Sequence, residues 1–150
     1  MTASQHLLEH FLPHLEASVA QALSALPDLA EQVDALWSGA RASCPQIDIP
    51  AADFLRFVAL RLDLSSFRGL HLLRVEDLYL LCAYVKGAPA AAPLFEARYF
   101  GPVTATLRRL RAEPDTIDDV KQALRQRLLL DRSVDPDHKQ YMGAGSLASW

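Results

Sequence analysis

The amino-acid sequence predicts an all-α protein. Apolar residues recur at intervals of three and four along most of the 150 residues, and this is the period of a helix with one buried side. Prolines and glycines fall between these stretches, where they mark the starts and ends of helices. Runs of alternating apolar and polar residues, the pattern of a strand, do not compete with this reading. About half of the residues are apolar, which is enough for an ordinary core.

The first helical stretch is expected over residues 5–26. Pro13 lies inside it and should either split the helix or begin its second part. A second helix should open after Pro27, where Asp28 is expected to cap it and Glu31, three residues later, to complete a capping box. Its inner side consists of apolar residues at helical spacing: Leu29, Val33, Leu36, Trp37 and Ala40.

A connector is expected over residues 44–50, because two prolines within it exclude a helix interior. Pro50 suits the first position of a third helix. The inward residues of that helix should be Phe54, Phe57, Val58 and Leu62. Residues 63–69 are expected to form a loop.

A fourth helix is predicted over residues 72–86 and should end at Gly87. Its inner side is expected to consist of Val75, Leu78, Cys82 and Val85. A fifth is predicted over residues 90–111, with a break or kink at Gly101-Pro102. Three arginines close together near its end, at 108, 109 and 111, fit a solvated helix terminus better than a phosphate site.

The sixth helix is predicted over residues 117–130. Thr116 followed by Asp119 has the spacing of a helix start. The residues expected to be buried are Ile117, Val120, Leu124 and Leu128. The opposite side is polar, and composition alone favours an ordinary solvated surface there.

Charge and hydropathy restrict the classes of function. The net charge is −3; residues 1–75 hold eight acids and five bases, and residues 76–150 hold ten of each. Neither half is the basic block that a free-standing duplex binder needs, so we expect the first partner to be a protein. The longest apolar run, 78–85, is too short to cross a bilayer, and a signal peptide is not recognisable. We therefore expect a cytoplasmic protein without a membrane partner.

Candidate reactive residues do not form a recognisable catalytic or metal-binding pattern. Cys44 and Cys82 lie in or beside apolar patterns, which favours buried, reduced thiols. His6, His10 and His14 recur every four residues, but Pro13 interrupts their helix, and surface histidines are the better interpretation. Phosphate-binding glycine loops and nucleophile elbows are not found. The expectation is a non-enzyme without a metal or cofactor.

Five short motifs occur in a suggestive order: Asp77-Leu-Tyr-Leu80, Gly87-Ala-Pro-Ala90, Phe95-Glu-x-x-Tyr99, Asp119-Val-Lys-Gln122 and Gly143-Ala-Gly-Ser-Leu-Ala-Ser-Trp150. In this order they resemble region two of bacterial RNA polymerase sigma factors. Residues 37–62 more loosely resemble the helical N-terminal extension of a group of short alternative sigma factors, similar to the extracytoplasmic-function type. Two positions depart from the family pattern: Ala88 and Ala123 each stand where an acid is common.

The resemblance implies a helical extension over residues 1–70 and an incomplete three-helix core over 71–150. It implies a sigma factor, or a truncated fragment of one, that docks on the coiled coil of the polymerase β′ subunit through Asp119, Gln122 and Arg125. Tyr141 and Trp150 would belong to the element that meets melted promoter DNA, but promoter binding is expected only in a full-length form. An anti-sigma protein is a possible further partner. The alternative is a helical protein–protein adaptor, or a competitor for the sigma-binding surface, that does not bind DNA.

Overall fold

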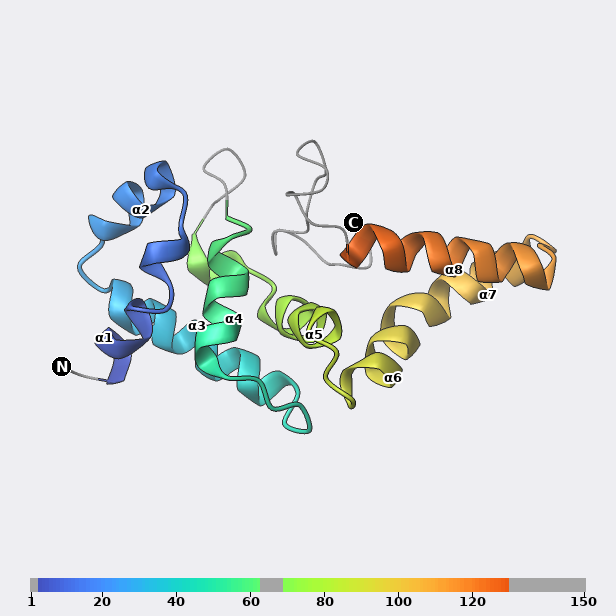
Figure 1. Ribbon diagram of the computed structural model, residues 1–150, viewed down its shortest axis with the longest axis horizontal. Helices are drawn as coiled ribbons and strands as arrows, with labels where there is room; N and C mark the ends of the chain where they lie inside the picture. Colours follow the sequence, from blue (N-terminus) through green and yellow to red (C-terminus); the bar gives the residue numbers. More distant parts are fainter. Residues whose placement is uncertain (1–2, 63–68, 130–150) are drawn as a thin grey trace.

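The computed structural model describes residues 3–62 and 69–129, and side chains as far as Arg127 (Figure 1). Every regular element in these ranges is helical, which confirms the predicted fold class. The elements of the first range are α1 (Ala3–Leu8), η1 (Leu12–His14), α2 (Ala17–Ser24), α3 (Leu29–Ser43) and α4 (Ala51–Ala59). Those of the second are η2 (Leu70–Leu72), α5 (Val75–Val85), α6 (Ala91–Phe95), η3 (Glu96–Phe100), α7 (Gly101–Arg109) and α8 (Pro114–Leu129).

Three groups of helices are arranged along the long axis of the molecule. Figure 1 shows α1 to α4 gathered at one end, α5 in the middle, and α6 to α8 at the other end. One connected hydrophobic core extends from Phe11 to Phe100, so apolar packing continues across the expected boundary at residue 70. None of the described helices has both the length and the apolar character that a membrane crossing requires.

Of the two predictions for the N-terminal stretch and the helix after it, one is confirmed and one is wrong. The stretch 5–26 is split at Pro13, as the first of the two alternatives had it: Pro13 lies in the 3₁₀ turn η1, and α2 begins only at Ala17. The capping box at Asp28 is wrong: the Asp28 side chain makes no capping bond, and its Oδ1 accepts from Gln32 Nε2 at 3.0 Å. The backbone of Asp28 (φ −107°, ψ 22°) is not extended, whereas a capping side chain needs an extended backbone to reach the first free N–H groups.

Helix α4 agrees closely with its prediction. All four residues expected to face inward are buried. Phe54, Phe57 and Val58 recur at the period of a helix whose one side meets the core, while Leu62 follows the end of the helix. Pro50 immediately precedes the helix instead of occupying its first position, and its carbonyl accepts from the N–H of Phe54 at 3.2 Å. Of the loop expected over 63–69, only Gly69 belongs to the described residues.

Helix α5 is more deeply buried than its sequence pattern predicts. Its residues from Asp77 to Ala83 are all buried, whereas Val85, predicted to face inward, is exposed. The reason is that α5 packs against α3 and α4 on one side and against α6 on another, so no single stripe describes it. The helix also begins at Val75 rather than 72, after the 3₁₀ turn η2.

Both cysteines are buried free thiols, as predicted. The hydroxyl of Tyr79, a residue of α5, donates to the carbonyl oxygen of Ile47 at 2.9 Å. Its ring packs against Phe54 and Trp37, with centroids 5.5 and 6.2 Å away. These contacts attach the 44–50 connector, α3 and α4 to the central helix.

The predicted break at Gly101-Pro102 takes the form of a change in helix type. Residues Glu96–Phe100 form a turn of π-helix, and α7 follows with Pro102 in its first turn. Proline has no N–H to donate to the preceding turn, and a widened π turn accommodates the missing bond. The π turn thereby places two charged residues, Glu96 and Arg98, at the joint between α6 and α7.

Helix α8 begins three residues earlier than predicted. Pro114 is its first residue, a position at which a missing N–H costs nothing and the fixed φ of proline suits the helix. The start signature at Thr116 is therefore wrong, because Thr116 already lies inside the helix. Ile117 is buried as expected, whereas Val120 and Leu124, which were also expected to be buried, are half-buried; the side chain of Leu128 lies outside the described residues.

Candidate functional site

One side of α8 is polar and exposed along its length. Ile117 and Leu124 face the rest of the molecule, and a helix places residues three and four apart on the same side. The opposite side therefore presents a row spaced at four, three and four residues, here called the polar row: Asp115, Asp119, Gln122 and Gln126. All four of its residues are exposed.

Two predicted polymerase-binding residues lie in this row. Asp119 is exposed, and Asp118 lies beside it, so the N-terminal half of the row is acidic. Gln122 is exposed as well, and its Oε1 has a long contact of 3.5 Å with Arg125 Nη1. The row therefore offers carboxylate acceptors followed by amides, which can both donate and accept hydrogen bonds.

The third predicted residue, Arg125, has a different environment. Its Nε and Nη2 donate to the same carboxylate oxygen, Oε1 of Glu96 in η3, at 2.9 and 2.6 Å. The guanidinium carbon also lies 5.4 Å from the ring centroid of Phe100. The hydrogen bonds to Glu96 are the main reason why the pKa of Arg125 is raised. Arg125 thus joins α8 to η3 at the border of the polar row.

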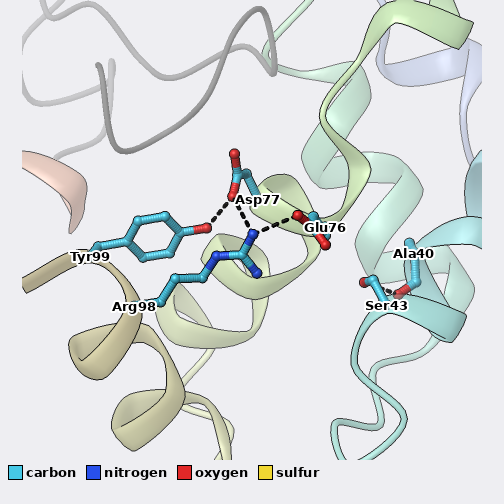
Figure 2. Close-up of polar contacts among 6 residues, drawn as sticks. All are labelled: Ala40, Ser43, Glu76, Asp77, Arg98 and Tyr99. Atoms are coloured by element: carbon cyan, nitrogen blue, oxygen red, sulfur yellow. Dashed lines mark hydrogen bonds and ion pairs between the residues drawn. The ribbon is translucent and has the colours of Figure 1, made fainter. Parts of the chain in front are cut away.

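A second set of polar contacts joins η3 to α5 (Figure 2). Arg98 Nη2 lies 2.5 Å from Oε1 of Glu76 and 3.7 Å from Oδ1 of Asp77. The hydroxyl of Tyr99 donates to Oδ1 of Asp77, which is 5% exposed. Two of the motifs that carry the sigma resemblance, 77–80 and 95–99, therefore meet directly in the folded chain.

Aromatic packing surrounds these polar contacts. Phe95 is fully buried and stacks on Tyr84, with ring centroids 4.3 Å apart and planes 13° apart. Tyr99 and Phe100 pack on the same ring at 4.7 and 5.9 Å. Buried aromatic side chains contribute large contact areas, so packing holds η3 to α6 and α6 to α5, while ion pairs hold η3 to α5 and α8.

Sequence reasoning did not identify Glu96, Arg98 or Asp77 as contact residues. Their partners lie 22 and 29 positions away along the chain. Local spacing on a helix reports only pairs three or four residues apart. No signal in a single sequence links such distant charges. The motifs at 77–80 and 95–99 indicated the order of these segments along the chain, but not that their side chains meet.

The remaining candidate residues do not converge on a site. Tyr141 and Trp150 lie outside the described residues. His6 and His10 pack edge to face at 5.3 Å, and His6 Nδ1 lies 3.2 Å from Oε2 of Glu9. Within 3–62 and 69–127, no three histidine, cysteine, aspartate or glutamate side chains are grouped closely enough to hold a metal ion. The three arginines near the end of α7 are exposed.

Comparisons of the chain with protein-family models, with curated proteins and with solved structures find no match. A role for the polar row must therefore be argued from its geometry and from the order of the motifs.

Proposed function

We propose that the chain acts as a bacterial RNA polymerase sigma factor, or as a truncated fragment of one, and docks on the β′ coiled coil through the polar row of α8. The observation that carries this proposal is the division of α8 into two sides. Ile117, Leu124 and Arg125 attach one side to the molecule, while Asp119 and Gln122 are exposed on the other. Such a helix can meet a second helix without rearranging its own core.

The chemistry of the row indicates what the partner surface should offer. Asp119 can accept hydrogen bonds from an arginine or lysine, and Gln122 can exchange bonds with a polar side chain or an exposed backbone group. Charged and amide groups on a fixed helix give an interface its register and specificity. A helical partner with basic groups opposite Asp118 and Asp119 fits this pattern.

The same row is poorly suited to DNA. Asp115, Asp118 and Asp119 place negative charge on the exposed side of α8, and phosphate groups would be repelled there. Promoter contact in our proposal belongs to a full-length form, with Tyr141 and Trp150 in the element that meets unpaired bases. Catalysis belongs to the polymerase, the setting is the cytoplasm, and an anti-sigma protein would compete for the same row.

The alternative is a helical adaptor or competitor that occupies the polymerase without promoter recognition. The acidic row and the net charge of −3 favour this alternative, because neither attracts DNA. The two functions differ in one measurable property. A sigma factor in its full-length form supports promoter-specific initiation with core polymerase, whereas a competitor only lowers the initiation supported by another sigma factor.

The first test is binding of the 150-residue chain to the isolated β′ coiled coil. We expect saturable binding, and we expect Asp119→Ala and Gln122→Ala each to weaken it by about tenfold, as for central interface residues. Matched controls are Glu31→Ala in α3 and Gln21→Ala in α2, which are also exposed and should bind as the wild type does. Absence of binding by a chain with a normal helical spectrum would refute the proposal, as would equal losses in the control variants.

A further inference from the structure

The C-terminal half of α8 has few attachments to the rest of the molecule. Its first half is held by the short 110–113 connection and by buried Ile117. Farther along, the half-buried side chain of Leu124 packs against the core, and the guanidinium of Arg125 bonds Glu96. Because α8 spans about 24 Å at 1.5 Å per residue, contacts of this half such as those of Leu124 and Arg125 influence the direction in which the helix runs.

Arg125 is the polar part of this attachment. Two of its nitrogens bond one oxygen of Glu96 at 2.9 and 2.6 Å, and Phe100 lies under the guanidinium group. Its side chain is 30% exposed and that of Glu96 is 41% exposed, so the pair lies at the edge of the core and not in open solvent. A guanidinium held in this way has fewer donors available for a partner protein.

Glu96 is itself a good anchor point because η3 is fixed on its other side. Arg98 and Tyr99, two and three residues later, bond Glu76 and Asp77 of α5 (Figure 2). The central helix, η3 and α8 are thereby connected in series by polar contacts. A substitution at Glu96 should therefore alter the orientation of the polar row, although Glu96 is not part of that row.

We propose that Arg125 is a positioning residue and not a contact residue: it orients the polar row by holding α8 to Glu96 of η3. This inference rests on the proposed function for its binding consequence, but the attachment itself is a property of the chain alone. It makes docking depend on Glu96, a residue with no predicted role in binding.

The test is a double-mutant cycle with Glu96→Ala, Arg125→Ala and both together, measured as affinity for the β′ coiled coil. If Arg125 acts through Glu96, each single variant should weaken binding by about three- to tenfold. The affinity of the double variant should then be no lower than that of the single variant with the lower affinity. The reversed pair Glu96→Arg with Arg125→Glu should recover most of the affinity. Arg56→Ala, an exposed arginine of α4, controls for the loss of one positive charge.

A direct contact predicts a different pattern. Arg125→Ala would then weaken binding while Glu96→Ala bound as the wild type does, and the reversed pair would stay weak; either result overturns the proposal.

A second measurement uses no partner and separates this proposal from the proposed function. Amide hydrogen exchange over residues 118–127 should become faster by about three- to tenfold in both single variants, with exchange in α4 unchanged. This result would support the attachment even if the chain did not bind the β′ coiled coil at all. Unchanged exchange in α8 of both variants would overturn the proposal even if binding occurred.

Discussion

Helices α5 and α8 both carry acidic residues, but they use them in opposite ways. In α5, Asp77 is buried and accepts a hydrogen bond from Tyr99. In α8, Asp119 is exposed on the polar row. A buried polar group must be bonded within the protein, because an unsatisfied one is costly, whereas an exposed group can exchange its water for a partner. The comparison separates acids that stabilise the fold from acids suited to recognition.

The largest contrast concerns apolar residues of α5. Leu78→Ala should lower the free energy of unfolding by about 2–5 kcal/mol, because Leu78 is fully buried and its removal leaves a cavity. Urea denaturation provides the measurement. Leu72→Ala, in the preceding turn η2 at a residue that is 56% exposed, is the control and should change stability by less than about 0.5 kcal/mol. Equal effects would show that α5 is not the centre of the core.

The buried acid provides the next test. Asp77→Ala should cost about 1–3 kcal/mol of unfolding free energy, because it removes the acceptor of the Tyr99 hydroxyl inside the core. The neighbouring Glu76→Ala removes an exposed ion pair with Arg98 and should cost less than about 1 kcal/mol. A Tyr99→Phe variant combined with Asp77→Ala should show a non-additive loss in thermal or urea unfolding. If Glu76→Ala were the more damaging change, the contrast between buried and exposed acids would fail.

The stability of the chain at alkaline pH tests whether the thiol of Cys82 in α5 is buried and protonated. Burial raises the pKa of this thiol from 9.0 to about 12, so the folded chain holds the proton more tightly than the unfolded chain does. The stability contributed by the neutral thiol is present below pH 9 and is lost as pH rises from 9 towards 12.

Between pH 9 and 10 the loss attributable to Cys82 should be about 1 kcal/mol. It is measured as the difference in pH dependence of unfolding between the wild type and Cys82→Ala, since other groups also titrate in this range. Parallel curves for the two proteins would contradict a thiol that is buried and protonated.

The smallest effect on stability is expected in the polar row. Asp119→Ala should change the free energy of unfolding by less than about 0.5 kcal/mol, because the side chain is exposed on α8. The same variant should weaken binding to the β′ coiled coil by about tenfold. Thermal unfolding and binding are to be measured on one preparation. A loss of stability above about 1 kcal/mol would show that Asp119, like Asp77 of α5, stabilises the fold.

The sequence determined the helical class, the inward side of α4, the buried cysteines and the polar side of α8. These follow from local rules: an apolar period of 3.6 residues on a helix with one buried side, and prolines that exclude a helix interior. Where more than one neighbour acts on a helix, the same rules fail. Helix α5 is buried nearly all round, so its pattern could not reveal that Tyr79 and Leu80 are as buried as Leu78.

Only the tertiary structure decided which polar side chains meet. Arg125 belongs by sequence to the polar stripe of α8, yet it bonds Glu96, 29 residues earlier. Asp77 and Tyr99, 22 residues apart, pair inside the core. Local spacing fixes which side of a helix a residue occupies, but the partner of that side depends on how helices pack, and packing is determined by the whole core at once. Asp119 and Gln122 stay exposed for the same reason: no described helix packs against that side of α8.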